Sequence, residues 1–326
     1  MRRKLTCQRG VAVITALLLT TLAVTIVASL FWQQQVQVRS MENQRLHLQT
    51  KWILRGALDW TRLILGQAGI ERGNVTTLDG VWATPLAETR LDDYVERERV
   101  EGEQFDATLA GYVSDAQARY NLAGLAVNQA IKPAQVLAFS RLLSNLQLDP
   151  GLAQAAAQAM ARTQQRGAGG ADLNLSAGQA GAVSGAVPVA SGETLEFVQI
   201  EDLLSVPGFT PQALARLREF VTLLPEPTPL NVNTASAEVL AAVVENFSVS
   251  EAAALIYSRK QAYFKDAGDF TNRLNGKKLI GDVAIDVKSS YFLVASRVRL
   301  DRAALDAEAL IKRSNNGTTL VSIREN

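Results

Sequence analysis

The longest apolar stretch of the chain lies near its start. Residues 11–32 form a run of 22 residues without a charge, and the ten residues before it carry four basic and no acidic side chains. A helix of that length, at about 1.5 Å per residue, spans the roughly 30 Å hydrocarbon core of a membrane. Basic flanks stay on the cytoplasmic side, so Arg2, Arg3, Lys4 and Arg9 predict a cytoplasmic N-terminus, with the rest of the chain outside the cytoplasm.

A cleavable secretory signal is the first alternative to a permanent anchor. Such a signal also begins with a basic segment, but its apolar core has about 7 to 15 residues and is followed by a small-residue cleavage site. The present run is longer, which favours retention in the membrane. Two forms of anchor remain: an intact signal anchor, or a helix from which a cut between Gly10 and Val11 removes only the basic leader.

Helical features continue beyond the membrane run. Residues 33–65 contain no proline and a single glycine, Gly56, so we expect the helix to extend to about residue 65. Ile53, Ala57, Trp60 and Ile64 follow one another at intervals of four, three and four residues, which places them on one helical face. This face is predicted to pack on a globular domain.

Strand patterns occur in two separate parts of the chain. In the first part, Ala107, Leu109, Gly111 and Val113 alternate with polar or small residues and predict a half-buried strand. In the second part, residues 289–298 have strand composition, residues 305–311 alternate, and Asn316-Gly317 predicts a hairpin into a last strand at 318–323. The chain is therefore expected to build an antiparallel sheet from segments far apart in sequence.

Helical patterns fill the interval between these strands. Helices are predicted at 134–148 and 151–163, and a second helical block extends over 195–274. Thr210-Pro211 is an N-cap followed by an N1 proline, and Ser248 with Glu251 forms a capping box. Residues 166–192 are rich in glycine, alanine and serine, which predicts a flexible loop.

Several segments resemble a known family. Arg9-Gly10-Val11-Ala12-Val13-Ile14, followed by the apolar helix, resembles the prepilin-type leader of type IV pilins and type II secretion pseudopilins. The fifth residue after Gly10 is Thr15, where most of these proteins have glutamate, and this departure is typical of the K class of minor pseudopilins. Segments further along the chain also resemble the K class: 82–86, 111–122, 206–208, 231–235 and 289–298.

The resemblance implies an α+β fold. A long N-terminal transmembrane helix would pack on an antiparallel pilin-like sheet, with a large all-helical domain of the SAM or helix-hairpin-helix type inserted between strands. The implied organisation is a leader at 1–10, a membrane segment at 11–32 of a helix 11–65, a first pilin-like α/β part at 66–122, an inserted helical domain at 123–275 with a loop at 166–193, and a second sheet part at 276–326.

The resemblance also implies a role in assembly. Prepilin peptidase would cut between Gly10 and Val11, and Val11 would become a methylated N-terminus. Thr15 would mark a subunit at the tip of the pseudopilus, since no subunit above it needs a glutamate contact. The implied partners are the I, J and H classes of minor pseudopilin, the major pseudopilin, the peptidase and the inner membrane, with the bulk of the chain in the periplasm.

Nucleic-acid binding is a competing hypothesis, because the second helical block also resembles helix-hairpin-helix domains. Residues 195–275 contain six basic and ten acidic side chains, a net charge of −4, whereas phosphate binding requires the opposite sign. The turn at 245–248 has no glycine and begins with Glu245. We therefore expect no nucleic-acid partner. A minor pilin-like protein of a DNA-uptake system and an unrelated signal-anchored periplasmic protein remain as alternatives.

Candidate chemistry is sparse. His47 is the only histidine, and the only cysteine, Cys7, lies in the leader, so histidine triads, zinc clusters and thiol catalysis are not expected. Loss of the leader would reduce 33 basic residues by four against 32 acidic ones, a net charge of −3. The resemblance implies calcium near the helical domain, and the chain offers weak candidate ligands that do not form an EF-hand motif: Asp266, Asp269, Asn272, Asn275, Asp282 and Asp286.

Overall fold

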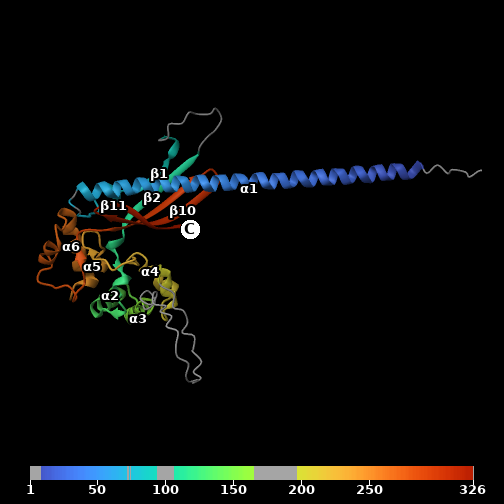
Figure 1. Cartoon of the computed structure of the whole chain (residues 1–326). Helices are drawn as coiled ribbons and strands as arrows, with labels where there is room; N and C mark the ends of the chain where they lie inside the picture. Colours follow the sequence, from blue (N-terminus) through green and yellow to red (C-terminus); the bar gives the residue numbers. More distant parts are fainter. Residues whose placement is uncertain (1–8, 72, 74, 94–105, 165–196, 326) are drawn as a thin grey trace, which may run out of the picture.

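The computed structural model describes residues 9–71, 73, 75–93, 106–164 and 197–325. A single long helix extends along one side of an antiparallel sheet, and shorter helices lie on the other side of that sheet (Figure 1). The N-terminal half of the long helix projects away from both. The predicted α+β class with a long N-terminal helix is confirmed. The predicted flexible loop at 166–192 lies outside the described residues.

Helix α1 extends over Arg9–Glu71, 63 residues without a break. It ends six residues beyond the predicted limit of 65, although Gly66 and Gly69 have low helix propensity. Packing explains the difference at Gly69, where a Cβ atom would lie 3.2 Å from Cδ of Arg313. The absence of a side chain at Gly69 thus lets the helix lie close to Arg313 of the sheet, and tertiary packing outweighs propensity.

The face by which α1 contacts the sheet differs from the predicted one. Leu54, Leu58 and Leu65 are the large apolar residues buried on this face. Of the residues predicted to form it, Ile53, Ala57 and Ile64 lie at its margin and are half-buried, whereas the prediction for Trp60 is wrong, because Trp60 is 54% exposed. The buried face of α1 is rotated around the helix axis relative to the predicted face, and this rotation leaves the Trp60 indole in solvent.

The five-stranded sheet has the order β1-β2-β9-β10-β11, with every neighbouring pair antiparallel. Gly111 in β2 lies opposite Ser296 in β9, and a Cβ atom at Gly111 would lie 2.5 Å from the carbonyl oxygen of Ala295, so only glycine fits. The predicted strands and the predicted hairpin at Asn316-Gly317 are confirmed. The strands are β1 (Leu86–Arg90), β2 (Ala107–Asp115), β9 (Tyr291–Leu300), β10 (Ala303–Ser314) and β11 (Gly317–Glu325), and the short helices η1 (Val81–Ala83) and η2 (Leu91–Asp93) flank β1.

The chain between β2 and β9 forms a helical insertion with its own hydrophobic core. This core includes residues from Tyr120 to Val287, so the insertion is larger at both ends than the predicted 123–275. Residues 276–290 contain few regular elements, so the periodicity of the sequence did not reveal where the insertion ends. Its elements are η3 (Ala116–Ala118), β3 (Tyr120–Asn121), η4 (Leu122–Leu125), β4 (Ala126–Val127), β5 (Ala130–Ile131), α2 (Pro133–Asn145), α3 (Leu152–Gln164), η5 (Ile200–Ser205), α4 (Pro211–Leu217), β6 (Val221–Thr222), β7 (Leu230–Asn231), α5 (Ala237–Val243), α6 (Val249–Gln261), α7 (Ala267–Asn272) and β8 (Ile285–Asp286).

The predicted caps define helices of the insertion. Thr210 accepts a 3.2 Å hydrogen bond from the backbone N–H of Ala213 at the start of α4. At the start of α6 the hydroxyl of Ser248 accepts from the N–H of Glu251, and the Glu251 carboxylate accepts from the N–H of Ser248. Both predicted caps are confirmed, and they satisfy N–H groups that the first turn of a helix leaves without partners.

Candidate functional site

A buried carboxylate lies where the sheet meets the helical insertion. Asp115, the last residue of β2, is 3% exposed. Its Oδ2 atom accepts hydrogen bonds from Asn231 at 2.9 Å, Thr234 at 2.6 Å and Ser289 at 2.5 Å. Its Oδ1 atom accepts a 2.8 Å bond from the backbone N–H of Gln117. One side chain thus joins the end of β2, strand β7 with the loop after it, and the segment before β9.

Arg313 of β10 extends this cluster toward α1. Its guanidinium donates to Oγ1 of Thr76 at 2.6 Å, to the carbonyl of Ser289 at 2.9 Å and to the carbonyl of Leu65 at 3.3 Å. It also lies 4.8 Å from the centre of the Phe292 ring, a cation–π distance. The end of α1, the chain after it, the sheet and the insertion therefore meet in one network of polar groups.

The electrostatics of this junction reflect its burial. Desolvation raises the pKa of the Asp115 carboxyl, and the hydrogen bonds from Ser289, Thr234, Gln117 and Asn231 oppose that increase. Desolvation also lowers the pKa of Arg313. The groups around Asp115 are hydrogen-bond donors held by packing, an arrangement suited to holding two parts of a chain together.

The sequence contained a signal for this junction. Asp115 belongs to the segment 111–122, and Asn231 and Thr234 belong to the segment 231–235, both of which resemble the K class. The contact between the two segments was not predicted, because 116 residues separate Asp115 from Asn231.

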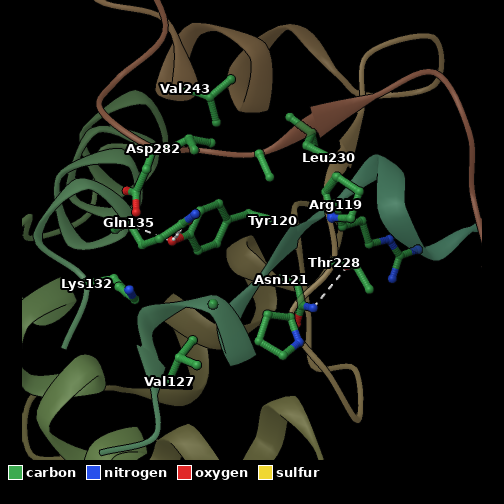
Figure 2. Close-up of a pocket in the computed structure, with 15 residues that line it drawn as sticks. Arg119, Tyr120, Asn121, Val127, Lys132, Gln135, Thr228, Leu230, Val243 and Asp282 are labelled. Atoms are coloured by element: carbon green, nitrogen blue, oxygen red, sulfur yellow. Dashed lines mark hydrogen bonds between the residues drawn. The ribbon is translucent and has the colours of Figure 1, made fainter. Parts of the chain in front are cut away.

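A cavity of about 190 Å³ lies within the insertion (Figure 2). The Tyr120 hydroxyl donates to Gln135, and the Asn121 amide donates to Thr228, so these lining groups bond to one another. Burial raises the pKa of the Tyr120 phenol well above its ordinary value. Lys132 also lines the cavity. Tyr120 and Leu230 line the cavity and also belong to the hydrophobic core of the insertion.

The predicted calcium ligands occupy separate structural roles. Asp266 caps α7 by accepting from the N–H of Asp269, and Asp269 accepts two bonds from Arg273 at 2.9 and 2.7 Å, which lower its pKa. Asp282 lines the cavity of Figure 2, and Asp286 accepts from the N–H of Val287.

The two predicted asparagine ligands lie close to α7. Asn272 is its last residue, and Asn275 follows it with a φ of 52°. Among the residues that the structure describes, no group of three or more histidine, cysteine, aspartate or glutamate side chains is placed to hold a metal ion. Calcium binding stays a prediction.

The predicted processing site lies at the start of α1. Gly10 and Val11 are the second and third residues of this helix, and Thr15 lies one turn further on. Within the described residues, α1 is the one helix whose length and apolar composition suffice to cross a membrane. The hydroxyls of Thr20, Thr21 and Thr25 donate to carbonyls three residues earlier, so polar groups of this segment are satisfied inside the helix, as lipid requires.

An exposed apolar stripe continues along α1 beyond the membrane segment. Its members are separated by 7, 4, 11 and 7 residues, so they share one face, on the side opposite the sheet. Gly56 lies within this face, and a Cβ atom there would contact nothing within 4 Å. The stripe consists of Met41, Leu48, Trp52, Leu63 and Ile70, which are 58 to 78% exposed.

A long helix with an apolar N-terminal half, packed by its C-terminal half on an antiparallel sheet that has a helical insertion between strands, defines the class of pilin-like proteins to which the comparisons point. Models of type II secretion system protein K match residues 118–226 and 230–288, which correspond to the insertion. A type II secretion system protein K of Pseudomonas aeruginosa is 32% identical over 98% of this chain and 92% of its own. That of Aeromonas hydrophila is 25% identical over 95% and 98%.

A solved structure has the same fold. It is the GspK-GspI-GspJ complex of the type 2 secretion system of enterotoxigenic Escherichia coli, which matches with a TM-score of 0.62 and 18% identity over 88% of this chain and 99% of the other. The chain therefore belongs to the type II secretion system protein K family, the K class of minor pseudopilins. Members of this family are structural components of a secretion apparatus. The apolar N-terminal helix of this chain fits a single-pass membrane anchor.

Proposed function

We propose that this protein forms the tip of the type II secretion pseudopilus, where it starts or caps assembly with other minor pseudopilins and so supports protein export. The observation that carries this proposal is the exposed apolar stripe of α1. The stripe extends for about 44 Å along the helix, and Arg45 and Asp59 lie on the same face between its apolar members. A partner helix anchored beside α1 in the same membrane can pack along the membrane segment and along the stripe.

The composition of the stripe is that of an interface. Trp52 of the stripe is 71% exposed, Trp60 beside the stripe is 54% exposed, and Gly56 lies one helical turn from each. Tryptophan is over-represented among residues that dominate binding energy, and glycine lets a second helix approach closely. The far face of the sheet instead carries ion pairs, including Arg297 with Asp306 at 2.7 Å, so α1 offers the better apolar docking surface.

The partners proposed are the I, J and H classes of minor pseudopilin and the major pseudopilin. In the solved complex, the K protein of similar fold is assembled with GspI and GspJ. Thr15 supports the tip position, because a subunit with nothing above it needs no glutamate there. A threonine also avoids the cost of about 2.5 to 3.5 kcal/mol for a carboxylate at mid-membrane depth.

Processing completes the proposal. Prepilin peptidase cuts between Gly10 and Val11, and Val11 becomes a methylated N-terminus. The basic leader favours a cytoplasmic N-terminus, so the protein crosses the inner membrane once and the sheet and insertion lie in the periplasm.

Co-purification of the full-length chain with I- and J-class minor pseudopilins in detergent tests the proposal. Trp52→Ala should weaken the complex by about tenfold or more. The control is Tyr257→Ala, which removes an aromatic ring that is 69% exposed on α6, outside the stripe, and should leave assembly unchanged. Normal assembly of the Trp52 variant, or no complex with the wild-type chain, would contradict the proposal.

A further inference from the structure

The sheet ends in a long strand with an open edge. In the part of the chain that the structure describes, β11 has β10 on one side and no strand on the other. All nine residues of β11 except Thr318 are exposed. The opposite edge strand, β1, has five residues and an irregular register between Leu86 and Thr89, features that discourage pairing.

The outward backbone groups of β11 can be assigned. Arg62 of α1 donates to the carbonyl of Thr318 at 2.7 Å, so this carbonyl points away from β10. Backbone groups alternate between the two edges of an antiparallel strand, so those of Leu320 also point outward and those of Thr319 point toward β10. Leu320 therefore presents a backbone donor and acceptor at the open edge.

Apolar side chains accompany this edge. Leu320, Val321 and Ile323 are 38%, 41% and 43% exposed. Main-chain hydrogen bonds supply affinity when an extended segment joins a sheet, and side chains beside the edge supply selectivity. The edge thus fits an extended polypeptide segment.

A second copy of this chain does not fit. Thr318 bonds to Arg62 and Glu325 pairs with Lys51 at 3.0 Å, so β11 runs antiparallel to α1. Two identical edges pair antiparallel about a two-fold axis. That axis would turn one α1 over, and the two apolar N-terminal halves would point in opposite directions, which one membrane does not allow.

We propose that the open edge of β11 pairs with an extended segment of a different minor pseudopilin anchored in the same membrane. This inference rests on the proposed function and adds a second contact to the α1 stripe. The helical stripe positions the partner, and the strand edge fixes its height above the membrane through the register of hydrogen bonds.

Amide hydrogen exchange of the full-length chain in detergent, alone and with the I and J proteins, tests this contact. The Leu320 amide should exchange rapidly in the chain alone and about tenfold or more slowly in the complex, whereas Thr319 is protected in both. Leu320→Pro removes an outward donor without breaking the ladder to β10, so it should weaken the complex at an unchanged melting temperature. Leu320→Val keeps the donor and should assemble normally.

The outcomes separate the two proposals. A complex in which Leu320 exchanges as fast as in the chain alone, and which Leu320→Pro still forms, overturns the strand contact and leaves the proposed function intact. Protection of Leu320 that depends on the concentration of this chain alone overturns the choice of partner. Failure of the wild-type chain to form any complex overturns the proposed function and the inference with it.

Discussion

Asn231 donates a 2.9 Å hydrogen bond to Asp115, 116 residues earlier in the chain, and this bond joins the insertion to the sheet. Both side chains are buried. The insertion lies beside the C-terminal end of α1, away from the apolar N-terminal half of the helix (Figure 1). The junction therefore holds the insertion in place relative to the sheet and the end of α1.

Truncation of the buried carboxylate tests this role. Asp115→Ala removes the acceptor that the buried side chains of Asn231, Thr234 and Ser289 share, and we expect the free energy of unfolding to fall by about 3 kcal/mol. Urea denaturation followed by circular dichroism measures the change. Asp306→Asn, at an exposed ion pair on the sheet, is the control and should cost less than about 1 kcal/mol. Equal losses for the two variants would contradict the importance of the junction.

The pH dependence of stability tests the electrostatics of Asp115. Burial raises its pKa above the ordinary value of 3.8, so between that value and the raised pKa the folded chain holds a proton that the unfolded chain has released. The contribution of Asp115 to the free energy of unfolding should therefore fall as pH rises through this window and stay constant above it. Unfolding of the wild type and of Asp115→Asn across pH measures the difference, which should shift in favour of the variant with rising pH. The opposite slope would contradict the direction of the pKa shift.

The sequence predicted the features of the fold that depend on neighbouring residues. Thr210 and Ser248 cap helices through atoms three residues away, and Asn316-Gly317 closes a hairpin between adjacent strands, so local chemistry sufficed. Trp60 was assigned to the wrong side of α1, because periodicity identifies a face only approximately when apolar residues surround a helix. The Asp115 cluster depends on how the insertion folds back onto the sheet, which no local pattern contains.

Removal of a confirmed cap should weaken the insertion. The Ser248 hydroxyl accepts the N–H of Glu251 at 3.2 Å, so Ser248→Ala should lower the free energy of unfolding by about 1 kcal/mol. Ser258→Ala is a matched control in the same helix, because the Ser258 hydroxyl only donates to the carbonyl of Leu255. Chemical denaturation of both variants measures the difference, and an equal effect would contradict the capping assignment.

Enlargement of Gly10 should block processing. If the peptidase cuts after Gly10 as proposed, a larger side chain there would obstruct the cut, so Gly10→Leu should leave the ten-residue leader attached. Intact-mass measurement of the membrane-extracted protein, from cells with and without their prepilin peptidase, distinguishes the two forms. Leu5→Ala changes the leader away from the cut and should be processed normally. A mature chain beginning at Val11 from the Gly10 variant would contradict the proposed site.

Filling the gap at Gly56 should separate assembly from folding. A Cβ atom at this position contacts nothing within 4 Å, and leucine favours a helix over glycine by roughly 0.5 to 1 kcal/mol, so Gly56→Leu should keep or raise the melting temperature of the chain. The same side chain would keep a partner helix from approaching between Trp52 and Trp60, and the complex with I- and J-class pseudopilins should be weakened by about tenfold or more.

A matched substitution elsewhere controls for added apolar surface. Ala254→Leu places the same side chain at an exposed position of α6, outside the stripe, and should not affect assembly. Quantitative co-purification compares the two variants with the wild type. If Gly56→Leu assembled as well as Ala254→Leu, the close helix contact at Gly56 would be excluded. If both variants failed equally, the loss would reflect added apolar surface and not the geometry of the stripe.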